Sequence, residues 1–345
     1  MTEANGQGPV DKDGRGADSS ILLVDKHVEY ILSLDKRQEE IEYWMTEHLR
    51  ISGIYWGLVA LSLMNKQQAL DKEEVIKYVL SCQNSDGGFG GHTNHDSHLL
   101  YTMSAVQILV MYNELNRIDG AKVISYVKSL QDPITGEVSG DSWGEKDTRF
   151  AFISLAILSF FNAIDSINVD GVVKYVEKSM NYDGGFGSEP GGESHSAQIF
   201  TCLAALAIAG KLQIVDRERL SRWLAERQLK SGGLNGRPQK LEDVCYSWWV
   251  LSSLKILDRV HWVDKDRLCE FILSAQDNVG GGIADRPGDM ADVYHTCFGI
   301  AGLSLAGFKG YNLEQVDPVY CMPVSVIKRA GLRGWIDAVP KSWKE

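Results

Sequence analysis

The sequence repeats itself with a period of 48 or 49 residues, and this periodicity constrains the fold more than any other feature. Glutamines that precede Gly-rich segments recur at Gln83, Gln131, Gln228 and Gln276, in steps of 48, 97 and 48 residues. Inside the long step, SMNYDGGFGSEPGG is a further copy, in which Met180 takes the place of the glutamine. Such spacing is typical of proteins that stack copies of one supersecondary unit.

Each repeat has the pattern of two helices joined by a Gly-rich turn. The first helix, as in 75–80 and 123–130, has apolar residues three and four apart, and the second, as in 98–112 and 244–257, is apolar on almost all sides. This pattern predicts helical hairpins with the amphipathic helix outside and the apolar helix buried inside. We expect an all-α fold, an α/α toroid or barrel of stacked hairpins over 21–330. The periodicity alone is also compatible with an open solenoid.

The two ends of the chain and its composition bear on where the protein is found and on which class of ligand it binds. Residues 1–20 are rich in Gly, Asp and Ser and lack an apolar core, which predicts a disordered tail without a signal peptide, and 331–345 are expected to form a C-terminal tail. The longest apolar run, 151–164, is too short to span a membrane. A net charge of −11 argues against nucleic acid as the main ligand. The six cysteines form no C-x-x-C pair and a chain of this length needs no disulfides, so we expect a reducing, cytoplasmic setting.

Polar residues gather where the second helices begin. Parallel inner helices bring their N-termini to one rim, where the positive ends of the helix dipoles favour an anion. The residues concerned are His95, His98, Arg149, His195, Asp243, Cys245, Asp292 and His295.

Three of these residues form a candidate zinc site. Asp243, Cys245 and His295 offer an oxygen, a sulfur and a nitrogen donor in adjacent repeats. Three protein ligands with an open fourth position are typical of catalytic zinc. Asp243 and Cys245 can converge only if Asp243 is a non-helical cap residue. Taken singly, the three residues are equally compatible with a helix cap, a small buried residue and a core histidine.

Cations and aromatic residues accompany this candidate zinc site. Arg237 and Lys240 directly precede it, and His195 and Tyr246 could also donate hydrogen bonds to a diphosphate. The inner helices carry apolar and aromatic side chains: Trp56, Tyr101, Met103, Phe152, Phe200, Tyr246, Trp248 and Trp249. Together they suggest a long apolar ligand with a diphosphate head. A solvated loop pair and ordinary core packing are the simpler alternatives.

Several motifs have a family resemblance. LNGRPQKLEDVCYSWW, ADRPGDMADVYHT, DGGFGSEPGGESHSAQ and HDSHLLYTMSAVQIL resemble the β subunits of protein prenyltransferases, and most closely the Rab geranylgeranyltransferase branch. The resemblance covers about residues 20–325 and implies an α/α barrel that pairs with a helical α subunit. It assigns the zinc ligands to Asp243, Cys245 and His295, and the catalytic diphosphate contacts to His195, Arg237, Lys240 and Tyr246.

The resemblance also implies lipid contacts and substrate length. The implied lipid-binding residues are Phe152, His195, Ser196, Ala197, Arg237, Pro238, Gln239, Lys240, Tyr246, Ser247, Trp248 and Trp249. Ser52 and Met103 match positions where farnesyl enzymes have tryptophan and tyrosine, so a longer lipid should fit at the closed end of the shaft. Asp285 matches a residue that places magnesium on the diphosphate in farnesyl enzymes.

The implied activity is zinc-dependent transfer of geranylgeranyl from geranylgeranyl diphosphate to C-terminal cysteines of Rab GTPases, which an escort protein presents. Cys245 would then be a metal ligand rather than a nucleophile. The alternatives within the family are geranylgeranyltransferase type I and farnesyltransferase. Outside it stand a terpene cyclase, whose D-x-D-D and D-D-x-x-D motifs do not occur in the sequence, an (α/α) glycosidase, and a non-catalytic repeat scaffold.

Overall fold

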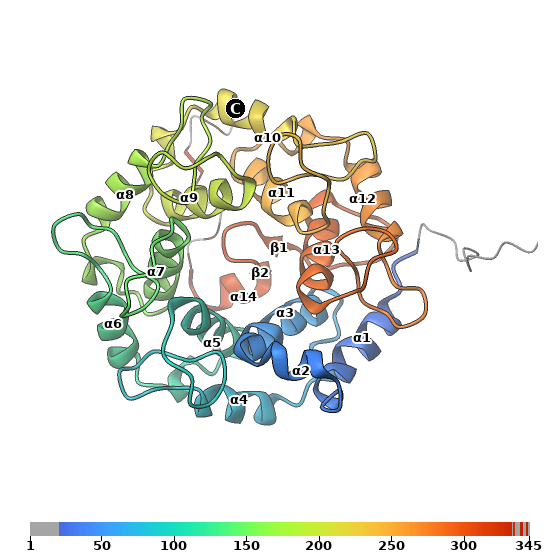
Figure 1. Cartoon of the computed structure of the whole chain (residues 1–345), viewed down its shortest axis with the longest axis horizontal. Coiled ribbons are helices and arrows are strands. Elements are labelled where there is room, and N and C mark those ends of the chain that lie inside the picture. The colour runs from blue at the N-terminus through green and yellow to red at the C-terminus, as the bar shows by residue number, and fades with distance from the viewer. Residues whose placement is uncertain (1–20, 333, 335–338, 341–342, 344–345) are drawn as a thin grey trace, which may run out of the picture.

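A computed structural model describes residues 21–332, 334, 339–340 and 343. Within these residues, twelve helices form six hairpins arranged in a ring (Figure 1). The outer helices are α1 (Val24–Ser33), α4 (Lys72–Ser81), α6 (Gly120–Ser129), α8 (Val169–Lys178), α10 (Arg217–Ala225) and α12 (Lys265–Ser274). The inner helices are α3 (Arg50–Leu63), α5 (Leu99–Met111), α7 (Arg149–Phe160), α9 (Ser196–Ile208), α11 (Tyr246–Ile256) and α13 (Val293–Ala306). The tail expected over 1–20 and most of the tail expected over 331–345 lie outside the described residues.

Short elements complete the chain. Helix α2 (Ile41–Met45) lies between the first outer and inner helices, and α14 (Val324–Arg329) follows a two-stranded antiparallel ladder of β1 (Val316–Asp317) and β2 (Met322–Pro323). The 3₁₀ turns are η1 (Leu34–Lys36), η2 (Glu47–Leu49), η3 (Gln67–Ala69), η4 (Leu115–Arg117), η5 (Ile164–Ser166), η6 (Leu212–Ile214) and η7 (Val260–Trp262).

The ring is closed. Each inner helix packs against the next, and α13, the last of them, packs against α3, the first (Figure 1). This contact excludes the open solenoid and confirms the predicted α/α toroid. The seam is held by Gln276, whose side chain accepts a hydrogen bond from the Leu23 amide at 2.9 Å and donates to the Ile21 carbonyl at 3.0 Å.

The recurring glutamine has a structural role between neighbouring repeats. Gln131 donates to the carbonyl of Asn168 at 3.0 Å and accepts from its amide at 2.7 Å. Gln228 makes the same pair of bonds with Asp264, both at 2.8 Å. Since Asn168 and Asp264 are the N-cap residues of α8 and α12, the glutamine of one repeat fixes the start of the next outer helix. Together with the contact of Gln276 at the seam, this accounts for the glutamine at three of its four positions, while Gln83 donates to the Gly87 carbonyl within its own turn.

Five of the six outer helices begin at a residue whose side chain caps the helix. The side chains of Asp71, Asp119, Asn168, Asp216 and Asp264 accept backbone N–H groups in the first turns of α4, α6, α8, α10 and α12. Such a cap is worth about 1 kcal/mol of stability.

The Gly-rich turns bring neighbouring repeats into backbone contact. Gly232 has φ +92, and a Cβ there would lie 2.4 Å from the carbonyl oxygen of Arg267 in the next outer helix. Gly87 has φ +95 and the same relation to Lys122, also at 2.4 Å. Both positions therefore need glycine, because another residue would strain the turn and separate two repeats.

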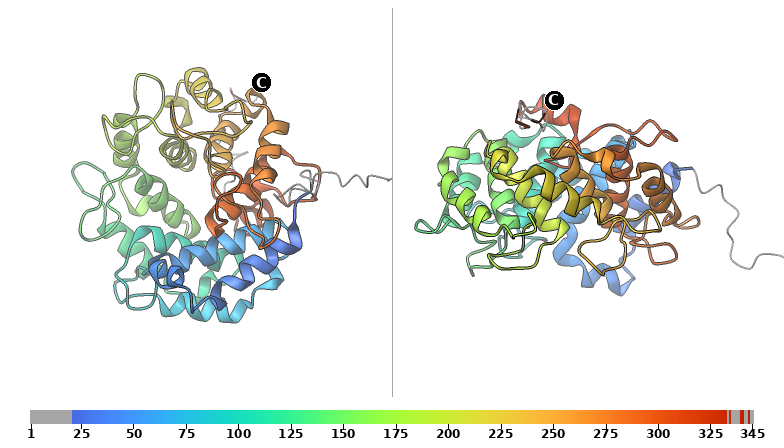
Figure 2. Two further views of the ribbon diagram at one scale, coloured as in Figure 1. Left: turned by 45° about the vertical axis from the view of Figure 1, so that its right-hand side comes forward. Right: turned by 90° about the horizontal axis from the view of Figure 1, so that it is seen from above.

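A hydrogen-bonded layer crosses the ring beyond the first turns of the inner helices. Tyr55 donates to the carbonyl of Cys321 at 3.0 Å, and Gln107 donates to the Tyr55 hydroxyl and to the carbonyl of Tyr320, each at 3.0 Å. The Tyr320 hydroxyl lies 3.1 Å from that of Ser159. These residues are buried, so the segment from β1 to β2, which lies inside the ring in Figure 1, closes one end of it. Figure 2 shows α14 on this face and α2 on the opposite one.

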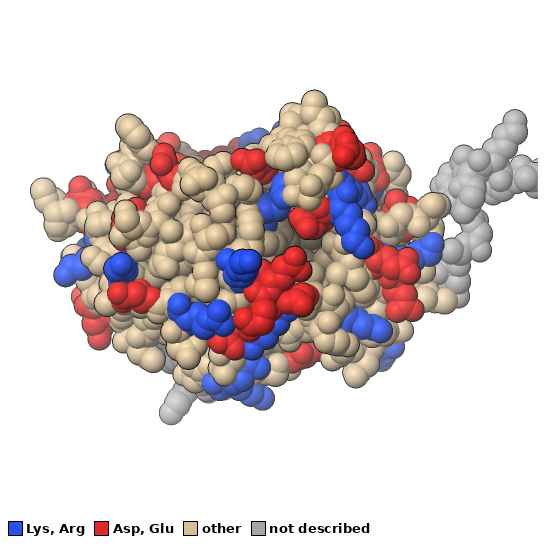
Figure 3. All heavy atoms as spheres, turned by 90° about the horizontal axis from the view of Figure 1, so that it is seen from below, with Lys and Arg blue, Asp and Glu red and all other residues tan. Residues whose placement is uncertain are grey.

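Two observations concern the predictions about membrane spanning and about nucleic-acid binding. No helix in the described part of the chain is both long and apolar enough to cross a membrane. On the side seen in Figure 3, Lys and Arg are interspersed with Asp and Glu, and that face has no broad basic area.

Candidate functional site

The three predicted metal ligands meet where α11 and α13 begin. One donor atom from each of Asp243, Cys245 and His295 lies within 4.8 Å of the others, and Nε2 of His295 is 3.2 Å from Oδ1 of Asp243. Asp243 is not helical, and its carboxylate accepts the amide of Cys245, the N-cap residue of α11, at 2.7 Å. This is the local conformation that convergence requires, since two helical residues in these positions would diverge.

A carboxylate behind His295 fixes the orientation of its ring. Asp292 caps α13, with Oδ1 accepting the amide of His295 at 2.8 Å and Oδ2 lying 2.6 Å from Nδ1 of the imidazole. Nε2 is thereby directed at Asp243. A second carboxylate on the far nitrogen is the usual arrangement of a metal-binding histidine.

The electrostatics of these ligands agree with a cation site. Burial acts to lower the pKa of His295, but hydrogen bonds to Asp243, Asp292 and Cys245 raise it to about 12. Burial raises the pKa of the Cys245 thiol to about 12. Burial opposes ionisation of Asp243, yet its bonds to His295 and Cys245 leave its pKa below the ordinary value. A positive charge is therefore already favoured between these side chains, and the O, S, N donor set suits zinc.

His195 and Tyr246 lie next to each other at the start of α9 and α11. Nδ1 of His195 accepts the amide of Ala197 at 3.2 Å, and Nε2 lies 3.3 Å from the Tyr246 hydroxyl. Burial and the charge of Arg237 lower the pKa of His195, so the ring is neutral at pH 7 and carries its proton on Nε2. This side of the site can donate hydrogen bonds without a charge of its own.

The two loop cations differ from each other. Arg237 forms an ion pair with Glu193 from the neighbouring repeat. Lys240 is exposed, and its ammonium has no partner among the residues that the structure describes. The backbone between them turns through Gln239 at φ +65, while Pro238 and Gln239 are exposed. An anion would therefore compete with Glu193 for Arg237 but would find Lys240 free.

Aromatic side chains of successive inner helices contact one another around one side of the ring. Phe200 packs against Phe152, Trp248 and Trp249 with ring centroids 5.6, 5.5 and 5.3 Å apart, and Trp249 lies 4.8 Å from Phe298. Trp249 is half-buried, as are Ala197 and Tyr246, so each of these three side chains keeps some exposed surface. Ser196, Ser247 and Trp248 have no exposed surface and pack behind them.

Ser52 and Met103 lie on the other side of the ring. Both are 6% exposed, and the Ser52 hydroxyl is 3.1 Å from that of Ser104 on α5. The hydrogen-bonded layer of Tyr55 and Gln107 begins one helical turn further along α3 and α5. The hydrogen-bonded layer thus crosses the ring just beyond Ser52 and Met103.

Asp285 borders the metal ligands. Its carbonyl accepts the amide of Val244 at 2.9 Å, and its carboxylate lies 3.4 Å from Arg286. Burial together with the neighbouring Asp289 raises the pKa of Asp285. Two close carboxylates beside the cation site provide oxygen ligands of the kind that magnesium prefers.

The sequence interpretation missed two features of this site. The role of Asp292 was not assigned, although its position one turn before His295 is a readable signal for a histidine-orienting carboxylate. The ion pair of Arg237 with Glu193 joins loops of different repeats and has no signal in the sequence.

Comparison with known proteins adds independent evidence. Residues 22–322 match the family model of the prenyltransferase alpha-alpha toroid domain. The chain is 51% identical over 320 residues to the geranylgeranyl transferase type-2 subunit beta of Saccharomyces cerevisiae, covering 90% of this chain and 97% of that protein. It is 47% identical over 193 residues to the protein of the same name from Candida albicans, covering 52% of this chain and 56% of that one.

Solved structures share the architecture. Candida albicans protein geranylgeranyltransferase-I complexed with GGPP superposes with a TM-score of 0.79 at 21% identity, over 93% of this chain and 100% of that chain. A type II terpene cyclase from Scytonema superposes with a TM-score of 0.57 at 11% identity, over 83% and 98%. These likenesses show the toroid fold. The match to the family model and the identity along almost the whole yeast protein show more: this chain belongs to the prenyltransferase α/α toroid family and, within it, to the type-2 geranylgeranyl transferase β subunits, which are prenyl transferases.

Proposed function

We propose that this chain binds zinc through Asp243, Cys245 and His295 and transfers geranylgeranyl from geranylgeranyl diphosphate to C-terminal cysteines of Rab GTPases. It would act in the cytoplasm as a heterodimer with an α subunit, on Rab proteins presented by an escort protein. The observation that carries the proposal is the convergence of an O, S, N donor set beside a group of diphosphate-type donors. The yeast relative supports the choice of lipid and partner subunit by its name.

The chemistry divides between the metal and the side chains around it. Zinc bound by the three ligands would lower the pKa of a substrate thiol and hold it as a thiolate. His195 and Tyr246, which lie within 3.3 Å of each other, would donate to the diphosphate as its negative charge develops on leaving. Lys240 and Arg237 would add positive charge on the same side, and Asp285 could hold a magnesium ion on the diphosphate. Half-buried aromatic side chains such as Trp249 would hold the lipid and exclude water from it.

The assay that tests this proposal uses the chain with its α subunit. We expect transfer of geranylgeranyl, in preference to farnesyl, to a Rab protein in the presence of escort protein. Preferential use of a C-a-a-X peptide would instead favour the type I enzyme or farnesyltransferase. A terpene cyclase would convert the lipid without any protein acceptor.

Lys240→Ala is expected to slow transfer about 30-fold in single-turnover measurements, which corresponds to about 2 kcal/mol. The reason is that Lys240 is the loop cation without a competing carboxylate. Lys230→Ala, which removes another exposed lysine ten residues earlier in the chain, serves as the control and should leave the rate unchanged. Equal rates in both variants would remove Lys240 from the proposed diphosphate site.

Zinc affinity is expected to rise about a hundredfold per pH unit near neutrality. In the metal-free protein His295 and Cys245 both have a pKa of about 12 and are protonated at pH 7. Zinc needs the neutral imidazole and the thiolate, so binding releases two protons, and each proton contributes a factor of about ten per pH unit. Calorimetry across one pH unit measures this slope. A tenfold change or less would mean that at most one proton is released, so that one of the two groups either is not a ligand or is already deprotonated in the metal-free protein.

A further inference from the structure

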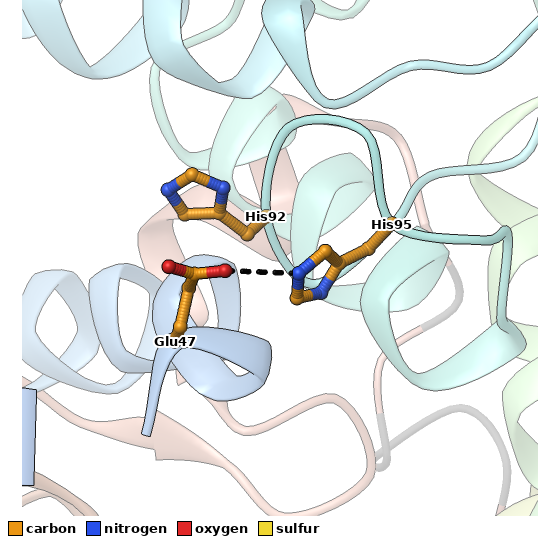
Figure 4. Close-up of side chains that lie close together, drawn as sticks. All are labelled: Glu47, His92 and His95. Carbon is orange, nitrogen blue, oxygen red and sulfur yellow. Dashed lines mark hydrogen bonds and ion pairs between the residues drawn. The ribbon is translucent and has the colours of Figure 1, made fainter. Parts of the chain in front are cut away.

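A second group of metal-ligating side chains lies outside the site described above. Glu47 comes from η2, directly before the first inner helix, α3. His92 and His95 come from the Gly-rich turn between α4 and α5. One donor atom from each lies within 4.8 Å of the other two. Figure 4 shows the Glu47 carboxylate facing both imidazole rings. None of these residues belongs to the proposed zinc and diphosphate site.

The hydrogen bonds in this cluster leave ligand positions available. Nε2 of His95 lies 3.0 Å from Oε1 of Glu47. Nδ1 of His92 lies 2.9 Å from the Thr93 hydroxyl and 3.2 Å from the Thr93 carbonyl, and in the tautomer whose Nδ1–H donates to these oxygens, Nε2 presents its lone pair. A metal-binding histidine usually donates the N–H of its other ring nitrogen to a backbone carbonyl in this way. The Tyr78 ring packs against that of His92 in a T-shaped arrangement, with centroids 5.9 Å apart, and further restricts its orientation.

A third group, His98, Asp141 and Glu145, is a weaker candidate. Oδ1 of Asp141 already accepts the amides of Trp143, Gly144 and Glu145. Nδ1 of His98 accepts the amide of Leu100. The potential metal ligands in this group are therefore one imidazole nitrogen and two carboxylates, one of which already binds backbone amides. Only the Glu47 cluster offers two imidazoles and a carboxylate that is not committed to backbone bonds among the described residues.

The donor set indicates the kind of metal. Two nitrogen ligands and one oxygen suit zinc or a related divalent transition metal, whereas calcium and magnesium prefer oxygen ligands throughout. The side chains of His95 and Glu47 are 35% and 32% exposed. An ion there could be reached from solvent and could complete its coordination with water.

We propose that Glu47, His92 and His95 form a second zinc site, which fastens the segment 41–49 to the Gly-rich turn between α4 and α5. The two backbones are already in contact, since the amide of Ile51 donates to the Gly91 carbonyl at 3.0 Å and a Cβ on Gly91 would meet the carbonyl of His48. That segment carries α2, with Ile41, Trp44 and Met45 exposed. Bound zinc would therefore hold an apolar surface element in place on the face opposite α14 (Figure 2).

The test starts from Cys245→Ala/His295→Ala in the full chain with its α subunit, so that the first site is removed. Titration with zinc in a calorimeter should show one ion that is lost when His92→Ala and His95→Ala are added. Removal of one ligand, in His92→Ala alone, should weaken binding at least about 100-fold, because even outer partners of ligands cost 10- to 100-fold. His48→Ala removes an exposed histidine from the same turn as Glu47 and should change nothing.

Two further measurements separate this site from nonspecific binding. Cobalt in the starting variant should give a spectrum without thiolate-to-metal charge transfer, since the cluster contains no cysteine. Hydrogen exchange in 41–49 should slow on addition of zinc in the starting variant and not in His92→Ala. The same stoichiometry and affinity with and without His92 and His95, or exchange in 41–49 that zinc does not change, would overturn the proposal.

Discussion

Cys245→Ala should abolish zinc binding at the first site and reduce transfer by more than about a thousandfold, while the ring stays folded. The thiol is one of the three converging proposed ligands and is 6% exposed, so its removal would leave two protein ligands. A metal that stabilises the reacting sulfur contributes several kcal/mol, which corresponds to at least this factor in rate. Helix α11 should survive, because its first amides are arranged by Asp243 and the backbone rather than by the thiol.

Cys269→Ala is the matched control for this prediction. Cys269 is a buried free thiol, 8% exposed, on the outer helix α12, and it belongs to none of the metal-binding groups found in the described residues. Both variants lose a small buried side chain and should lose about the same stability. Metal analysis and single-turnover transfer then separate them. Zinc retained in full by Cys245→Ala, with the second group of ligands also removed, would overturn the assignment of Cys245.

The hairpins could be predicted from the sequence because the signals that define them are local. Helix amphipathicity and the aspartate caps act within one repeat, and the Gly-rich turns and the recurring glutamine mark the register between repeats. Closure of the ring could not be predicted in this way. It depends on the angle between successive hairpins and on contacts such as that of Gln276 with Leu23, which are 253 residues apart.

The candidate site likewise has features that the sequence indicates and features that only the folded structure shows. Asp243 and Cys245 are neighbours in sequence, and the repeat register relates His295 to them, so the sequence could indicate these three residues as candidate ligands. Their convergence could not be predicted, because it depends on where α11 begins, and a shift of one residue there would separate the ligands. The closing layer around Tyr320 lay beyond prediction altogether, since that segment follows the last repeat and no periodic pattern describes it.

The length of the lipid should be set by Ser52 and Met103. The buried layer of Tyr55, Gln107 and Tyr320 crosses the ring one turn beyond Ser52 and Met103. The last carbons of a long lipid must therefore lie beside Ser52 and Met103. Geranylgeranyl exceeds farnesyl by five carbons, which are worth up to about 4 kcal/mol when buried at about 0.8 kcal/mol each, or as much as about a thousandfold in relative efficiency. Ser52→Trp, alone or with Met103→Tyr, should fill that space.

The measurement is the ratio of transfer efficiencies with geranylgeranyl and farnesyl diphosphate. We expect the ratio to fall by up to about a thousandfold in Ser52→Trp/Met103→Tyr, with farnesyl transfer kept or improved, because only the longer lipid needs the filled volume. Ser52→Ala is the control, since it removes the bond to Ser104 without adding volume and should preserve the ratio. Circular dichroism and thermal unfolding establish that each variant is folded. If the folded double variant keeps the ratio of the unmodified chain, Ser52 and Met103 serve only the packing of α3 against α5, and lipid length must be decided elsewhere in the ring.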